Sequence, residues 1–286
     1  MLVMAFPEIQ FHATDWNGKF REVPANVLVL KADEFLDHQY DVVIYDNRHT
    51  APVWELTVPK SVYVFHCERD LGIPLDRESV VRAFDSCDHV VSVGAHKLWT
   101  MRDFAKHPKA HAIRHAAFPV EPSSPIRGLV GTSHNAMSSE QIAVWNDIHP
   151  GFPSLVIGHA NGAGPWPKAT PDGYPAYLKE LSKLDVFVNV VCGDSFGMAP
   201  MEAMTLGIPI ITGLSRDIPD QFIPGWNCII TNGRAHDTTK SICHWAKILI
   251  NDRGFRDSIG LEGRKAALEF FSLEKFQQNW RLIFEA

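Results

Sequence analysis

Two carboxylates, Asp194 and Glu202, stand eight residues apart in the stretch DVFVNVVCGDSFGMAPMEAMTLGIPIITG, which covers residues 185–213. Apolar runs rich in Val and Ile lie before and after the pair, so one buried strand is predicted to enter the stretch and another to leave it. An ionised carboxylate can accept hydrogen bonds from both hydroxyls of a vicinal diol. The pair is therefore predicted to hold a polyhydroxylated ligand, although each residue alone also has an ordinary structural explanation in a turn or near a helix start.

A short helix is predicted between the two strands, beginning near residues 198–200, because proline is tolerated in a first helical turn. Gly207 is a natural end for this helix, and Pro209 lies just beyond it. The free backbone N–H groups around residues 196–198 are predicted to form an anion site, and Gly197 lets a phosphate or sugar approach the backbone closely. A diphosphate between two polyhydroxylated rings suits this arrangement, which is the chemistry of a nucleotide sugar.

Short runs rich in Val and Ile recur along the chain and predict buried parallel strands. The runs fall at 2–6, 26–30, 41–46, 61–66, 89–94, 127–131, 154–158, 185–191, 208–212 and 227–231. Helical patterns lie between several of them, at 78–87, 138–148 and 173–184. Strands that alternate with helices predict an α/β fold with parallel sheets.

The division into domains follows from a proline-rich stretch, HAAFPVEPSSPIRG, at residues 115–128. It predicts an N-terminal domain over 1–120 and a second domain over 121–270, facing each other across a cleft. A closing helix is expected over 271–286, with Phe276, Trp280 and Phe284 on one face. Ligands of open α/β sheets sit beyond the carboxyl ends of the strands. The candidate loops and residues there are His12, His66, 94–96, 131–135, 158–164 and 192–197.

The composition is that of an ordinary globular protein, with 45% hydrophobic and 21% charged residues in a chain of 286. A formal net charge of -6 argues against a surface built as a whole to hold nucleic acid, while a local basic patch stays possible. The five cysteines include no CxxC pair, which favours a reducing compartment over a disulfide framework. We find no signal-peptide pattern and no apolar run long enough for a membrane span, so a cytoplasmic location is expected.

The stretch DSFGMAPMEAMTLGIPIITG resembles the signature of family-four retaining glycosyltransferases of the GT-B fold, in which a Glu is followed, after seven residues, by a second Glu. The segments RDIPDQFIPGWNCIIT, LSKLDVFVNV, LVIGHANG and FRDSIGLEGRKAALEFFSLEKF resemble further parts of the same family's second domain. The resemblance covers residues 154–286 and is most specific over 185–232, whereas over 1–120 it is one of layout only. It implies two Rossmann-like domains and a C-terminal helix that closes across them.

The resemblance also implies roles for individual residues. Asp194, at the position of the first Glu, would contact the hydroxyls of the donor sugar, and Glu202 would bind the ribose diol of the nucleotide. His66 resembles a cleft histidine that contacts the donor sugar, although a lone histidine at a strand end is more often structural. The other donor-binding residues expected are Ser195, Phe196, Gly197, Met198, Gly131, Ser133 and His134. The implied reaction needs no metal and no cofactor, because the nucleotide-diphosphate sugar is a co-substrate.

The sequence departs from the family pattern at two places. Asp194 is one methylene shorter than the usual Glu, which indicates a different donor sugar or a different seating of it. The loop 131–140, GTSHNAMSSE, lacks the Arg and Lys that the family uses to neutralise the diphosphate, and offers Ser133, His134 and Asn135 as hydrogen-bond donors instead. The basic residues that could supply the charge are Arg69, Lys97, Lys168 and Arg216.

The acceptor is left open by the sequence. Residues 96–115 hold five Lys and Arg against a single Asp, a net of +4, which suits either a solvated helix face or a docking patch for a polyanion. The predicted acceptor-binding residues are Lys97, Arg102 and His12, and the candidate acceptors are DNA or another nucleic acid with a modified base, a lipid phosphate and a glycan. Pro108 interrupts the four-residue spacing of the histidines in this segment, so a metal site is not expected.

Two other functions fit the same residues. A GT-B epimerase or hydrolase would turn over the nucleotide sugar without an acceptor. A non-catalytic nucleotide-sugar or glycan-binding protein would bind it without turnover, and the loop that lacks Arg and Lys favours this reading somewhat.

Overall fold

The computed structural model describes residues 2–13, 23, 25–31, 34–35, 37–46, 58–65, 86–93, 109–118, 120–133, 139–158, 167–169, 171, 173–189, 197–213, 221–231 and 235–286. The chain divides into two compact units. Unit 1 consists of Met1–Asn17, Val23–Ala116 and Leu273–Ala286, and unit 2 of Gly18–Glu22 and Ala117–Ser272. Both contain parallel sheets with helices, which confirms the predicted α/β class.

The sheet of unit 1 is parallel, with the strand order β3-β4-β5-β6. Its strands are β3 (Val43–Asp46), β4 (Ser61–Phe65), β5 (His89–Ser92) and β6 (Ala110–Ala112). A separate parallel pair joins β1 (Phe11–Ala13) to β2 (Val27–Val29). The strands predicted at 26–30, 41–46, 61–66 and 89–94 are confirmed, whereas β1 and β6 were not predicted because neither contains a Val or an Ile.

The strand predicted at residues 2–6 is wrong, because Leu2–Ala5 form the helix α1. A short apolar run fits a buried strand or a buried helix equally well, so periodicity alone cannot separate them. Asn26 supplies what the helix needs: its side-chain amide donates to the carbonyl oxygens of Val3, Phe6 and Ile9 at 2.9, 3.0 and 3.1 Å. These bonds satisfy carbonyl groups at and just beyond the end of a helix, which lack partners within it.

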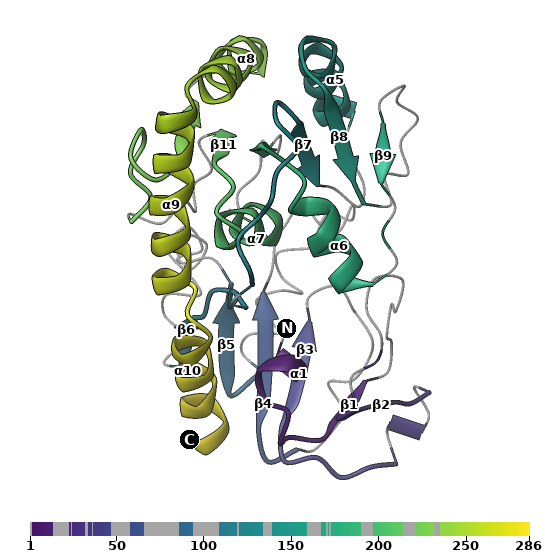
Figure 1. Ribbon diagram of the computed structural model, residues 1–286. Helices are drawn as coiled ribbons and strands as arrows, with labels where there is room; N and C mark the ends of the chain where they lie inside the picture. The colour runs from purple at the N-terminus through teal and green to yellow at the C-terminus, as the bar shows by residue number, and fades with distance from the viewer. Residues whose placement is uncertain are drawn as a thin grey trace. The chain divides into compact units, whose positions relative to one another are not determined.

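The C-terminal helix α10 (Leu273–Glu285) belongs to unit 1, where it packs against α1 (Figure 1). Phe276 and Trp280 are buried in the core of this unit, and Phe284 packs against the same cluster, as their predicted common face requires. Lys60 donates from Nζ to the carbonyl oxygens of Ile283 and Phe284 at 2.9 and 2.8 Å. A cation at these last carbonyls also complements the negative end of the helix dipole.

The helical reading of the basic segment 96–115 is wrong at residues 110–112, because these residues form β6. His111 on this strand meets the buried His89 of β5, with His89 Nδ1 3.1 Å from His111 Nε2. His89 Nε2 is buried and finds no hydrogen-bond partner among the described residues. Burial lowers the pKa of His89, as do the positive charges of Lys109, His111 and Lys60, against an opposing effect of Asp88.

We expect this histidine to make unit 1 sensitive to acid. The folded protein holds the pKa of His89 below its ordinary value of 6.5, so the unfolded chain takes up a proton more readily and acidification favours unfolding. Stability should therefore fall as the pH drops through 6.5. In urea titrations between pH 7 and 5, His89→Gln should reduce the loss of unfolding free energy on acidification. His38→Gln, at an exposed histidine of the same unit, should leave that loss unchanged. An unchanged loss in His89→Gln would contradict the assignment.

The sheet of unit 2 is also parallel, with the strand order β12-β11-β10-β7-β8-β9. Its strands are β7 (Val130–Ser133), β8 (Ser154–Ile157), β9 (Lys168–Ala169), β10 (Val186–Asn189), β11 (Ile210–Gly213) and β12 (Ile229–Thr231). The helices are α5 (Ser139–Ile148), the short 3-10 helix η4 (His149–Gly151), α6 (Tyr174–Leu181), α7 (Met198–Thr205), α8 (Ala235–Asn251) and α9 (Arg253–Phe270). All five strands predicted for this region are confirmed, and β9 was not predicted.

The core of unit 2 lies between its sheet and the helices α5 and α8, which contact each other along one side of the sheet (Figure 1). Trp145 and Ile148 of α5 are fully buried there, together with Ala246 and Leu249 of α8. Burial of each large apolar side chain contributes roughly 1.5–3 kcal/mol. This layer holds the strands in place, and with them the loops at their carboxyl ends.

The proline-rich linker runs in extended form along unit 2. Ser123 N–H donates to the carbonyl oxygen of Leu206 at 2.9 Å, just after α7, and Ile126 N–H donates to that of Lys183 at 2.7 Å. Arg264 of α9 donates to the carbonyl oxygens of Val120 and Thr205. The end of α7 is therefore tied both to the linker and to α9.

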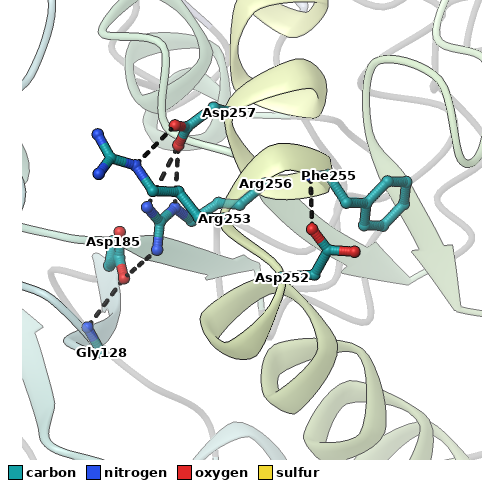
Figure 2. A network of polar contacts seen from close by, with 7 residues as sticks. All are labelled: Gly128, Asp185, Asp252, Arg253, Phe255, Arg256 and Asp257. Carbon is teal, nitrogen blue, oxygen red and sulfur yellow. Dashed lines mark hydrogen bonds and ion pairs between the residues drawn. The ribbon is translucent and has the colours of Figure 1, made fainter.

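A buried ion pair joins the start of β10 to α9 (Figure 2). The carboxylate of Asp185 accepts from Arg256 Nη1 at 2.9 Å and from the backbone N–H of Gly128, just before β7, at 2.8 Å. Asp252 begins α9 by accepting from the N–H of Phe255 at 2.9 Å, which is ordinary N-capping. The loop before β7, the start of β10 and the first turn of α9 thus meet at one carboxylate.

Removing the arginine from this pair should destabilise unit 2 strongly. Arg256→Ala leaves a buried carboxylate without its counter-charge, which costs about 3–5 kcal/mol. The matched control is Arg253→Ala on the same helix turn, whose side chain is 85% exposed and pairs with Asp257. An exposed pair of this kind is worth less than about 1 kcal/mol. Urea unfolding measures both, and equal losses in the two variants would show that the pair does not stabilise the unit.

Candidate functional site

The predicted helix after the first carboxylate is present as α7, which covers Met198–Thr205 and ends before Gly207 as expected. Gly197 caps its start with φ 76° and ψ 167°, a conformation essentially limited to glycine. Among the described residues, the atom nearest to the position where a side chain would begin is Pro200 Cδ at 3.8 Å, an ordinary van der Waals distance. The backbone conformation therefore requires the glycine at this position, and crowding does not.

Glu202 lies on α7 and is only 5% exposed. Its Oε1 accepts a hydrogen bond of 2.8 Å from the hydroxyl of Tyr174, at the start of α6. Tyr177, one turn further along α6, lies close enough to Glu202 and to Ser133, the last residue of β7, for both side chains to shift its pKa. Side chains from α7 and α6 therefore meet at one carboxylate, and the end of β7 is near Tyr177.

The electrostatics keep Tyr177 protonated. Burial raises its pKa well above the ordinary value, and the negative charge of Glu202 raises it further, while the hydrogen bond from Ser133 lowers it. A protonated Tyr177 can donate to the carboxylate and accept from the Ser133 hydroxyl at the same time. Tyr177 is therefore a neutral hydrogen-bond donor for Glu202 at ordinary pH.

Polar side chains also line the carboxyl ends of the neighbouring strands. Asn189, the last residue of β10, donates from Nδ2 to Thr212 Oγ1 on β11 at 3.2 Å. Thr231, at the end of β12, donates to the carbonyl oxygen of Thr212 at 3.2 Å. Thr132 Oγ1 on β7 is buried and finds no hydrogen-bond partner among the described residues. These contacts give the edge of the sheet a polar rim on the side where ligands of such sheets bind.

The structure brings together several of the predicted donor-site residues. Glu202, Gly197 and Met198 lie on or next to α7, and Ser133 reaches the same cluster through Tyr177. Gly131 lies inside β7, where a side chain would meet Leu184 Cδ2 at 2.3 Å, so packing explains this glycine.

Other predicted residues lie apart or outside the described residues. His12 is in β1 of unit 1, where its ring packs edge-on against those of His38 and Tyr40. Lys168 is exposed on β9 of unit 2. Outside the described residues fall Asp194, Ser195, Phe196, His134, Asn135, His66, Lys97, Arg102, Arg69 and Arg216.

Sequence reasoning missed Tyr174 and Tyr177. Their spacing places them on one face of a helix, and a buried tyrosine needs a partner for its hydroxyl, so the pattern was visible. What the sequence could not show was that this face of α6 lies against Glu202. That contact joins residues 28 positions apart.

Neither a metal centre nor a membrane helix is found in the described part of the chain. Its His, Cys, Asp and Glu side chains form no group of three that could hold a metal ion. None of its helices has the length and apolar character needed to cross a membrane.

Comparison with known proteins places the fold. No protein-family model matches the sequence, and no curated protein matches it. Among solved structures, Anabaena Alr3699/HepE in complex with UDP-glucose matches 91% of this chain and 86% of its own length, with a TM-score of 0.68 and 13% identity. Sucrose-phosphate synthase from Thermosynechococcus elongatus matches 96% of this chain and 88% of its own, with a TM-score of 0.66 and 13% identity. TarM matches 86% of this chain with a TM-score of 0.67 and 14% identity.

These neighbours have the GT-B fold, so the chain adopts this fold, which agrees with the predicted two Rossmann-like domains. The chain spans only 55% of the length of TarM. Identities of 13–14% establish the fold and not the activity, since one fold carries many chemistries.

The conformation of Gly197 yields a test of how α7 begins. Gly197→Ala should destabilise unit 2 by about 1–3 kcal/mol, because a Cβ disfavours this backbone conformation. The matched control is Gly151→Ala, at an exposed glycine with ordinary φ and no atom within 4 Å of the added carbon. The control should stay within about 0.5 kcal/mol of the parent protein. Thermal unfolding measures both, and a parent-like Gly197→Ala protein would show that α7 begins in another conformation.

Proposed function

We propose that the protein is a glycosyltransferase that moves a sugar from a nucleotide-diphosphate donor to an acceptor, with retention at the anomeric carbon. The observation that supports it most is the carboxylate of Glu202. It is buried on a short helix of a GT-B donor-type unit and is held by neutral hydroxyl donors. A carboxylate that accepts from a hydroxyl in this way can also accept from a diol.

The donor proposed first is a UDP-sugar, because Anabaena HepE, which shares the fold, is complexed with UDP-glucose. In this proposal Glu202 accepts from the two ribose hydroxyls. The N–H groups at the start of α7 face the diphosphate, while Ser133, Gly131 and the loop residues His134 and Ser195 complete the donor site. Asp194 and His66 contact the transferred hexose, with Phe196 and Met198 against it.

The chemistry is electrostatic in this proposal. The bond between the anomeric carbon and the diphosphate oxygen breaks, and the acceptor hydroxyl forms the new bond on the same face of the sugar. The departing diphosphate takes the bonding electron pair and receives the proton that the acceptor hydroxyl loses. The protein's part is to stabilise the departing anion and to orient the acceptor, without a metal, a cofactor or a protein nucleophile.

The acceptor is proposed to be anionic, because residues 96–115 carry a net charge of +4 in an acidic protein. The candidates are DNA with a modified base, a lipid phosphate and an anionic glycan, with Lys97, Arg102 and His12 as contacts. A cytoplasmic location follows from the sequence and stays a prediction.

Binding of UDP tests the donor site. Glu202→Gln keeps the shape of the side chain but removes its charge. It should therefore raise the Kd for UDP about ten- to a hundredfold in calorimetry, which is the size expected when hydrogen bonds to a charged group are lost. Glu262→Gln is the matched control, because Glu262 lies on α9 and pairs with the exposed Lys265. It should bind UDP like the parent protein. Equal UDP affinity in folded Glu202→Gln and parent protein would sink the assignment of Glu202.

Turnover separates an enzyme from a binding protein. The parent protein should release UDP from a UDP-hexose when an acceptor of the right class is present, and a coupled assay for UDP measures it. UDP release without any acceptor would identify a hydrolase or epimerase instead. Binding without release against nucleic-acid, lipid-phosphate and glycan acceptors would contradict the transferase.

A further inference from the structure

Tyr174, at the start of α6, donates to the carboxylate of Glu202 at 2.8 Å, and Tyr177 on the same helix lies close enough for this carboxylate to raise its pKa. Their rings stack, with centroids 5.9 Å apart and planes 19° from parallel. Residues three apart on a helix lie on the same face, so the two hydroxyls approach Glu202 from one side. Stacking restrains both rings, and the hydroxyls are therefore held where they are needed rather than recruited when a ligand binds.

Tyr177 also lies close enough to Ser133 for the Ser133 hydroxyl to lower its pKa. Ser133 ends β7 and stands directly before residues 134–138, whereas Glu202 lies on α7. Tyr177 is thus near both the end of β7 and the carboxylate on α7.

We propose that Tyr174 and Tyr177 are positioning residues, which aim the carboxylate of Glu202 at the vicinal diol of a nucleotide ribose and link it to the end of β7. This inference rests on the proposed function and deepens it. Neither tyrosine is a catalytic residue, because each acts on the ligand through Glu202.

The hydrogen-bonding capacity of a carboxylate agrees with this role. Two carboxylate oxygens offer about four lone-pair positions, so one carboxylate can accept from a phenol and from a diol at the same time. A phenol that stays protonated donates a hydrogen bond without neutralising the carboxylate, whereas an Arg or Lys partner would neutralise it. Hydrogen bonds to an ionised acceptor are shorter and stronger than neutral ones, and the diol benefits from the retained charge.

A ligand series distinguishes positioning from simple support of the fold. UDP has the diol, and 2′,3′-dideoxy-UDP lacks it while keeping the base and the diphosphate. If a tyrosine only supports the fold of the unit, replacing it should lower the affinity for both nucleotides equally. If it aims Glu202 at the diol, replacing it should lower the affinity for UDP alone.

The experiment compares both nucleotides by calorimetry in the parent protein and in Tyr174→Phe, Tyr177→Phe and Glu202→Gln. The parent should prefer UDP about ten- to a hundredfold, as expected for hydrogen bonds to a charged group. Each Tyr→Phe variant should reduce this preference about three- to tenfold and leave the dideoxy affinity unchanged. Tyr40→Phe is the matched control in unit 1, where the hydroxyl donates to the carbonyl oxygen of Phe35 at 3.0 Å. It should keep the parent preference.

The outcomes separate this inference from the proposed function. If Glu202→Gln keeps the preference for UDP, the assignment of Glu202 to the ribose is wrong, and the inference fails with it. If Glu202→Gln loses the preference but both Tyr→Phe variants keep it, only the inference is overturned. Equal weakening of UDP and dideoxy-UDP in the Tyr→Phe variants would show a structural role and overturn it as well. In the double variant Tyr177→Phe with Glu202→Gln, the loss should be no greater than in Glu202→Gln alone, because the tyrosine acts through that carboxylate.

Discussion

The buried carboxylate of Asp185 constrains the arrangement of unit 2. It stands at the start of β10 and binds both Arg256 of α9 and the N–H of Gly128 before β7. A charge in this environment is tolerated only when it is paired and hydrogen-bonded. The pair therefore fixes the entry of β7 and β10, which are neighbours in the sheet with Phe187 opposite Gly131. The carboxyl ends of these strands carry the polar rim of the candidate site.

The helix α7 carries the buried carboxylate of the candidate site. Met201, Ala203 and Met204 are buried, and Glu202 is buried among them as a charged residue that needs partners. The end of the helix is fastened by Arg264 at the Thr205 carbonyl and by the linker at Leu206. A side chain held in this way has little freedom left, so a ligand that meets it loses little free energy in ordering it.

Unit 1 has a different polar interior. Its histidine pair, His89 and His111, lies between adjacent strands, and Ser61 at the start of β4 donates to the carboxylate of Asp88. These contacts surround the amino ends of β4 and β5, away from the strand ends where ligands of parallel sheets bind. They are therefore best understood as part of the stability of the unit.

The sequence by itself determined the features that local chemistry controls. The Val- and Ile-rich runs predicted five strands of unit 2, though not β9, and Gly207 and Pro209 placed the end of α7, because turn chemistry and periodicity act over a few residues. They also placed Glu202 on that helix. The run at 2–6 could not be decided in this way, since its helix depends on Asn26, a residue outside the run.

Only the tertiary structure decided which distant side chains meet. The sequence pattern contains Tyr174, Tyr177 and Glu202, but only the fold brings α6 and α7 together, so that Tyr174 meets Glu202. The same holds for Asp185 and Arg256, which are 71 positions apart. Such pairs are selected by burial, because a buried polar group must find a partner wherever the fold brings one, and sequence distance plays no part in that choice.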